Sequence, residues 1–157
     1  MDRTRRDYQA CVHELKSAGL KRLSRDARMA LVLDVLWKHT HDAGVGWLGF
    51  YTLAEGKGEM VLAVCRPVPA CSPIGLQGVC GRAWRERRVQ IVPDVHALGE
   101  AHIVCDPSNL SEIVVPALNG DGTCDAVLDL DSKELDAFGD FDAEGLRAVL
   151  SAAGLSA

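Results

Sequence analysis

Residues 111–132 read SEIVVPALNGDGTCDAVLDLDS, and this stretch decides the fold class. Two runs rich in Val, Leu and Ala, at 111–118 and 124–131, flank the Gly-Asp-Gly turn at 120–122. Apolar runs of this length on either side of a short turn that contains glycine predict two strands of one hairpin. The central sheet is therefore expected to be antiparallel.

Acidic residues interrupt both of these apolar runs. Because alternate residues of a strand share a face, Asp129 and Asp131 are expected to project together, with Leu128 and Leu130 on the other face. Glu112 lies on the neighbouring strand and could join the two aspartates. Like charges side by side repel each other, so the cluster indicates one of three things: a bound ammonium group, a solvated strand end or a divalent metal. The loop of oxygen ligands that often accompanies a bound Ca²⁺ is absent from the sequence.

The rest of the chain places helices at both ends and further strands between them. Predicted helices cover about 5–18, 24–41 and the segment that follows Phe141, with Ser24 and Asp142 as N-caps. Predicted strands cover 45–53, 59–65 and 89–92, and a short helix runs from about 81 to 88. This order predicts an α+β fold, in which helices pack on an antiparallel sheet. A chain of 157 residues fits one domain, with N-terminal helices over about 5–43 and a core over about 45–145.

Composition excludes several classes of function. Apolar residues make up 48% and charged residues 25% of the chain, as in ordinary soluble proteins. The net charge of −5 offers no basic footprint for nucleic acid. The basic start at 1–6 is not followed by an apolar run, so no secretory signal is predicted, and no run approaches the length of a membrane span. We expect a cytoplasmic protein, whose six cysteines are catalytic, buried or metal-bound rather than permanently bridged.

Three cysteines lie in positions that suit a reactive thiol. Cys105 follows His102 in a long predicted connection over 97–110, where a nearby imidazole could favour the thiolate. Cys80 lies at the predicted start of a helix, and the positive end of a helix lowers a thiol pKa. Cys71 lies in a loop rich in proline. Taken alone, each of the three is explained at least as well as a cysteine without a chemical role: buried or inert for Cys105, packed for Cys80 and an ordinary loop thiol for Cys71. The cysteines on apolar faces, which we expect in the core, are Cys11, Cys65 and Cys124. No two of the six form a CxxC pair, which argues against a tetrahedral zinc site.

One predicted strand carries aromatic side chains on a single face. Trp47, Gly49 and Tyr51 alternate along 45–53 and therefore point the same way. Gly49 would leave open space between the two rings, which suits a pocket for an S-methyl group. The alternative is an ordinary aromatic stripe of the core.

Short motifs follow one another in a characteristic order over about residues 45–145. They are WLGFY (47–51), AC (70–71), GVCG (78–81), VPDVH (92–96), HIVCD (102–106), SEIVVP (111–116) and VLDLDS (127–132). In this order the chain resembles the free methionine-R-sulfoxide reductases, which are GAF-domain enzymes. The resemblance implies one GAF domain over residues 1–157 and the reduction of free L-methionine-(R)-S-oxide to L-methionine. The competing hypothesis is a GAF module that binds a small amino compound without turnover.

The resemblance also assigns roles to the cysteines. Cys105 matches the family's catalytic cysteine, which attacks the sulfoxide sulfur and becomes a sulfenic acid. Cys71 matches the usual resolving cysteine and Cys80 the alternative one, while Cys65 is an extra thiol that could substitute. Thioredoxin would then restore the thiols by exchange, so no bound cofactor and no metal are expected.

The resemblance extends to the residues that would bind the substrate. Glu112, Asp129 and Asp131 match the acids that hold the amino group and polarise the sulfoxide, and Trp47 and Tyr51 match the methyl pocket. The family is commonly dimeric, which implies a homodimer here. The segment AVCRP at 63–67 stands where the family usually has a Gly-Pro-Phe-Gln-Gly-like segment.

Overall fold

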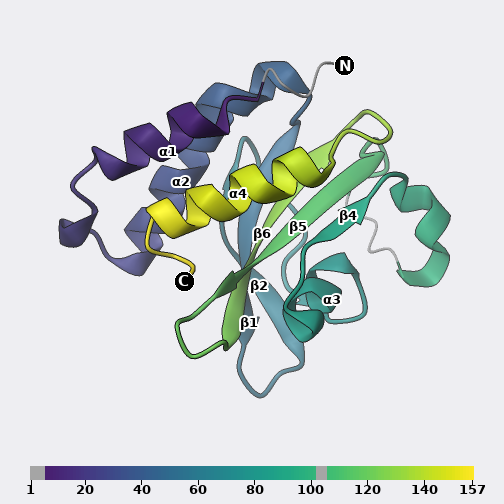
Figure 1. Ribbon diagram of the computed structural model, residues 1–157. Helices are drawn as coiled ribbons and strands as arrows, with labels where there is room; N and C mark the ends of the chain where they lie inside the picture. The colour runs from purple at the N-terminus through teal and green to yellow at the C-terminus, as the bar shows by residue number, and fades with distance from the viewer. Residues whose placement is uncertain (1–5, 102–105) are drawn as a thin grey trace.

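An antiparallel sheet forms the centre of the computed structural model, which describes residues 6–101 and 106–157. Within these residues the sheet has six strands in the order β3-β2-β1-β6-β5-β4, and every neighbouring pair is antiparallel (Figure 1). The strands are β1 Trp47–Ala54, β2 Glu59–Arg66, β3 Ile74–Gly75, β4 Gln90–Val92, β5 Ser111–Leu118 and β6 Cys124–Ser132. The predicted hairpin is confirmed as β5 and β6.

Helices cover both faces of this sheet. Three of them, α1 Tyr8–Lys16, α2 Arg25–Thr40 and α4 Asp140–Ala152, lie together on one face, and α3 Val79–Glu86 lies on the other (Figure 1). Short 3₁₀ segments occupy Leu20–Arg22, His41–Ala43 and Val95–Ala101. The last of them is kinked at Gly99 and lies partly within the predicted connection over 97–110. The predicted α+β class is confirmed.

The two faces of the central strands pack into separate cores. Leu48 and Phe50 of β1, with Leu128 and Leu130 of β6, are completely buried in the core shared with α1, α2 and α4. Burying side chains of this size stabilises the fold by about 1.5–3 kcal/mol each. The residues between them point to the opposite face, where α3 and the cavity described below lie. Alternation along β6 therefore separates the core from the site, as predicted.

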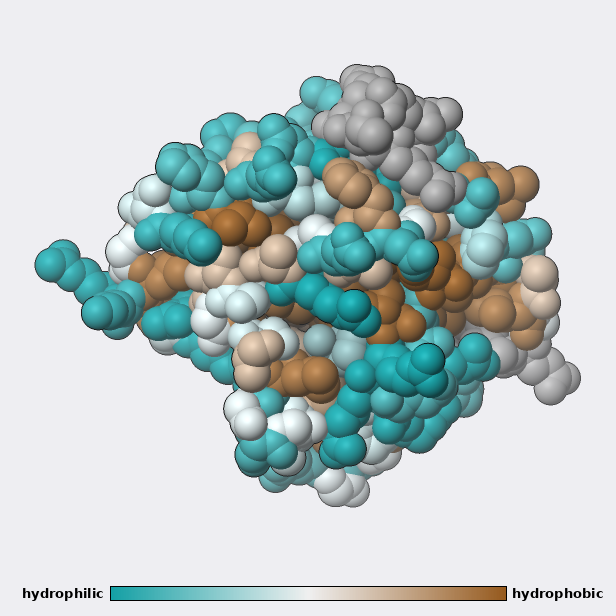
Figure 2. Space-filling model, in the orientation of Figure 1, coloured by the Kyte–Doolittle hydropathy of each residue, from teal (hydrophilic) through white to brown (hydrophobic). Residues whose placement is uncertain are grey.

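One face of the molecule carries hydrophobic residues in several patches (Figure 2). On the face shown in Figure 2, hydrophilic residues separate these patches from one another. Large apolar side chains that are exposed include Val61, Val68, Leu135 and Phe141. Among the helices described, none has both the length and the apolar character that a membrane crossing would need.

The predicted caps of two helices have different outcomes. Ser24 caps α2, because its hydroxyl accepts a hydrogen bond from the Ala27 amide at 3.2 Å. The prediction for Asp142 is wrong, since α4 begins at Asp140 and Gly139 is the N-cap. Asp142 instead reaches back to accept from the Gly139 amide at 2.9 Å. The carboxylate thus serves the helix start from inside the first turn.

A buried ion pair ties the N-terminal segment to this helix start. Arg6 Nη1 donates to Asp142 Oδ1 at 2.8 Å, and the Tyr8 hydroxyl donates to the same oxygen. Both members of the pair are completely buried. Arg6 also donates to the carbonyls of Ala43 and Ala137 and lies over the Phe138 ring. Segments from both ends of the chain are joined at this point.

We expect Asp142→Ala to lower the free energy of unfolding by about 3 kcal/mol, because it leaves a buried guanidinium without its anion. Urea denaturation measures the change. Glu144→Ala, an exposed site on the same helix, is the control and should change stability by less than about 0.5 kcal/mol. Equal effects of the two substitutions would contradict a structural role for the pair.

Candidate active site

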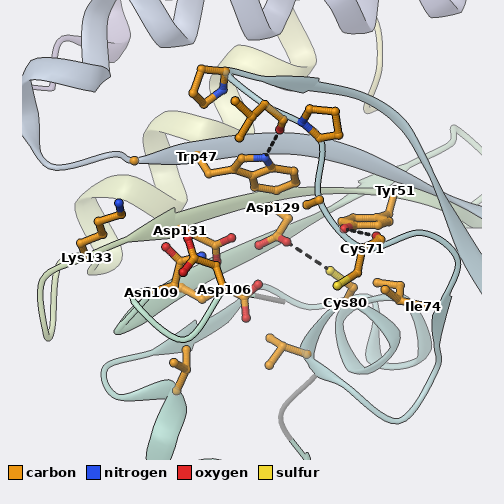
Figure 3. Close-up of a pocket in the computed structure, with 18 residues that line it drawn as sticks. Trp47, Tyr51, Cys71, Ile74, Cys80, Asp106, Asn109, Asp129, Asp131 and Lys133 are labelled. Carbon is orange, nitrogen blue, oxygen red and sulfur yellow. Dashed lines mark hydrogen bonds between the residues drawn. The ribbon is translucent and has the colours of Figure 1, made fainter. Parts of the chain in front are cut away.

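A cavity of about 470 Å³ opens on the sheet face that carries α3 (Figure 3). Strands β1, β5 and β6 form its floor, α3 contributes one wall, and the loop over 67–71 contributes another. This volume lies in the ordinary range for small-molecule sites. The predicted site residues outside the gap at 102–105 all line the cavity: Trp47, Tyr51, Cys71, Cys80, Glu112, Asp129 and Asp131.

Three carboxyl groups meet on the floor of the cavity. The sheet register pairs Glu112 with Asp131 and places Asp129 opposite Gly49, so all three project from one face. Glu112 and Asp129 are buried, at 9% and 5% exposure, and Asp131 is half-buried. Burial raises the pKa of Asp129 to about 8, with a further contribution from Asp131. It also raises the pKa of Glu112, next to Asp129, and of Asp131, next to Glu112. Asp129 therefore retains a proton near neutral pH, and an entering cation would displace that proton into the solvent.

The thiol of Cys80 lies against this cluster. Its Sγ donates to Asp129 Oδ2 at 3.7 Å, and Figure 3 shows the contact across the cavity. Burial, followed by the charges of Asp129 and Glu112, raises the pKa of the Cys80 thiol well above its usual range. The sequence-based expectation that the start of α3 would lower this pKa is therefore wrong. Desolvation and the acids of two other elements dominate.

The other described cysteines are either disulfide-bonded or free. Cys71 lines the cavity and is disulfide-bonded. Among the described cysteines, Cys11, Cys65, Cys80 and Cys124 are free. Cys105 and His102 lie outside the described residues. Cys11 and Cys124 are buried as predicted, while Cys65 is half-buried with its Sγ 3.2 Å from the Val68 carbonyl oxygen.

The aromatic residues of β1 line the cavity next to the loop over 67–71, which contains Cys71. The Trp47 indole donates to the Val68 carbonyl at 2.8 Å, and the Tyr51 hydroxyl donates to the Cys71 carbonyl at 2.8 Å. The two rings are 6.3 Å apart and tilted by 40°. Both aromatic residues therefore hold the backbone of the loop over the cavity as well as lining it.

The open space expected at Gly49 is occupied. A Cβ at this position would lie 2.5 Å from the Trp47 ring, so the indole folds over the glycine of its own strand. The prediction of a gap between the two rings is wrong for this reason. The absence of a side chain at Gly49 instead leaves room for the Trp47 indole.

Comparison with known proteins identifies the family. No protein-family model matches the chain. The solved structure of a free methionine-R-sulfoxide reductase from Neisseria meningitidis, in complex with its substrate, superposes with a TM-score of 0.83. The two sequences are 34% identical, over 93% of this chain and 85% of that one.

This chain belongs to the free methionine-R-sulfoxide reductase family. The Escherichia coli protein of that name is 38% identical over 109 residues, which are 68% of this chain and 63% of the E. coli protein. The chain thus matches slightly less than two thirds of that relative's length. A solved GAF domain superposes with a TM-score of 0.81 at 27% identity, covering 96% of this chain and 89% of that one. The fold of this reductase family member is therefore a GAF domain.

The sequence did not single out three residues that line the cavity of this reductase family member. Asp106 and Asn109 follow residues 102–105, and Lys133 follows β6. Lys133 is the one cationic side chain among the described residues that line the cavity. It stands two residues after Asp131, so the alternation that grouped the aspartates could have found it. Asp106 accepts hydrogen bonds from the amide and the hydroxyl of Ser108.

Proposed function

We propose that this protein reduces free L-methionine-(R)-S-oxide to L-methionine. The observation that carries the proposal is one cavity in which three buried or half-buried acids, two aromatic rings and the disulfide-bonded Cys71 lie together. The family supports it, and so does the Neisseria reductase solved in complex with its substrate. The cavity has room for a single amino acid.

Charge accounts for the preference for a free amino acid. The carboxyl cluster of Glu112, Asp129 and Asp131 would hold the substrate's ammonium group, which a methionine residue inside a protein lacks. Lys133 supplies a positive charge for the substrate carboxylate at the same cavity. Trp47 and Tyr51 would enclose the S-methyl group. A site that leaves buried acids unpaired when the ammonium is missing discriminates strongly between the two forms.

The reduction is two-electron thiol chemistry. The Cys105 thiolate attacks the sulfoxide sulfur, methionine leaves, and the oxygen remains on Cys105 as a sulfenic acid. A second thiol then attacks the Cys105 sulfur, which forms an S–S bond and releases the oxygen as water. Two thiols are thereby oxidised to one disulfide while the sulfoxide is reduced. The raised pKa of Asp129, caused by its burial, supports a protonated acid that polarises the sulfoxide near neutral pH.

We assign the resolving role to Cys71. It lines the cavity and is disulfide-bonded, which supports its part in a thiol–disulfide cycle. Cys80 is free, and its raised thiol pKa makes it a poor nucleophile. Cys65 is free and does not line the cavity. Thioredoxin would reopen the disulfide by exchange, so the cycle needs an external dithiol and no bound cofactor. The free cysteines agree with a reducing cytoplasm.

The decisive experiment measures NADPH consumption in a thioredoxin-coupled assay with the free R and S epimers of methionine sulfoxide. We expect turnover with the R epimer alone. A methionine sulfoxide residue within a peptide is the control and should not react. If the R epimer binds without turnover although the reductant is competent, the chain is instead a binding-only GAF module.

A further inference from the structure

Cys80, Glu112 and Asp129 offer three possible metal ligands in a single small space. One atom from each, a sulfur and two carboxylate oxygens, all lie within 4.8 Å of one another, and all three residues are buried. They come from α3, β5 and β6, which explains why no sequence spacing revealed them. Among the described residues, no other group of three or more such side chains is this close together.

The spacing already suits a tetrahedral ion. Zinc binds thiolate sulfur at about 2.3 Å and carboxylate oxygen at about 2.0–2.2 Å, so tetrahedral angles place the two donor atoms about 3.5 Å apart. The distance from Cys80 Sγ to Asp129 Oδ2 is 3.7 Å. The ion could therefore replace the thiol proton with little movement of either residue.

A second observation also points to a cationic ligand. The other carboxylate oxygen of Asp129, Oδ1, is buried and has no hydrogen-bond partner within the part of the chain that the structure describes. A buried polar atom in this condition is costly unless something binds it. The cluster borders the 470 Å³ cavity, which leaves room for a water molecule as the fourth ligand of the ion.

We propose that Cys80, Glu112 and Asp129 form a binding site for Zn²⁺ in this protein. The sulfur donor selects zinc and its soft congener Cd²⁺ over Mg²⁺ and Ca²⁺, which prefer oxygen ligands. Binding replaces the thiol proton of Cys80 and any carboxyl proton of the cluster with the ion, and these protons pass to the solvent. No redox step is involved, so the disulfide of Cys71 can remain closed.

Zinc bound here would also inhibit the enzyme. Glu112 and Asp129 cannot hold an ion and the substrate's ammonium group at the same time, so zinc and substrate should compete. This consequence rests on the proposed function, whereas zinc binding does not. Binding is therefore measured first on the oxidised protein, which needs no turnover and no added thiol that would chelate the metal.

The test titrates oxidised protein with Cd²⁺ while the sulfur-to-cadmium absorption band is recorded, and with Zn²⁺ against a chromogenic chelator. We expect one equivalent of each ion to bind, and Mg²⁺ in excess to leave the signal unchanged. Cys80→Ser should abolish the cadmium band and weaken zinc binding at least about tenfold, since losing even an indirect partner of a metal ligand costs this much. Cys124→Ser removes another buried free cysteine and should leave both signals intact.

A second variant keeps the test decisive if the Cys80→Ser protein does not fold. Glu112→Gln keeps the shape and the thiol, and it should weaken zinc binding while retaining a cadmium band. Unchanged zinc affinity in both variants would overturn the site, as would a cadmium band that survives Cys80→Ser. In the reductase assay, zinc should raise the apparent KM without lowering kcat. Zinc that binds with one-to-one stoichiometry but lowers only kcat would overturn the competition.

Discussion

Cys105→Ser is expected to reduce turnover of methionine-R-sulfoxide by at least about a thousandfold. Removing a covalent nucleophile leaves only the contribution of binding. Cys105 matches the catalytic cysteine of the family, and the cavity that would bind the substrate contains a buried thiol at Cys80 with a raised pKa, which is a poor substitute. Serine preserves the size of the side chain, so substrate affinity should change little. Turnover is measured in the thioredoxin-coupled assay and affinity by calorimetry.

The control for this prediction is a cysteine that is buried and free elsewhere in the fold. Cys11→Ser changes a thiol packed between α1 and α2, and it should keep full turnover if the variant folds. A thousandfold loss in Cys105→Ser together with retained binding would support the assigned nucleophile. Full activity in Cys105→Ser would mean that another thiol attacks the sulfoxide, and our assignment would be wrong.

Asp129→Asn is expected to reduce kcat/KM by about a hundredfold or more while making the protein more stable at alkaline pH. Asparagine has no carboxyl proton to share with the sulfoxide, and general acid catalysis contributes about 10²–10⁴-fold. The gain in stability has a separate cause, which is the cost of ionising a buried acid. Active sites often carry residues that oppose stability in this way.

The sign of the stability change follows from the pKa of Asp129. Burial raises it from 3.8 to about 8 in the folded protein, so the folded state holds a proton that the unfolded state has already lost. The favourable contribution of this proton is complete below pH 4 and is lost as the pH rises through 8. Asparagine cannot ionise, so the variant should gain on the order of 5 kcal/mol over the wild type well above pH 8 and little at pH 4.

Urea denaturation at acidic and at alkaline pH measures this difference. The matched control is Asp125→Asn on the same strand, where the carboxylate is exposed and its pKa is lowered by the hydrogen bond from Arg25. That variant should lose at most about 1 kcal/mol, because exposed ion pairs contribute little. An Asp129→Asn protein less stable than the wild type at alkaline pH would contradict the cost that we assign to burial.

The features that follow from the local pattern of the sequence were predictable. Strand alternation placed Leu128 and Leu130 in the core and Asp129 and Asp131 in the cavity, and the hairpin brought Glu112 beside them. These assignments need only the two-residue period of a strand and the position of one turn. The antiparallel sheet and the α+β class follow from the same reasoning.

The features that the sequence could not supply depend on tertiary burial. The acidity of Cys80 was expected to increase at a helix start, but acids from β5 and β6 and the loss of water act in the other direction. The space beside Gly49 depends on the rotamer of Trp47, which no sequence period reports. The local sequence suggests Asp142 as an N-cap, but its partners Arg6 and Tyr8 lie more than 130 residues away along the chain and cannot be found from that local pattern.

Strand β6 restricts how the length of this chain can change. Its even positions, Leu128 and Leu130, fill the core, and its odd positions, Asp129 and Asp131, face the cavity. Inserting or deleting a single residue within the strand would turn every later side chain to the opposite face, with charges in the core and leucines in the cavity. The exposed turn at 120–123 has no such constraint. Viable variation in the length of this hairpin should therefore be confined to its turn.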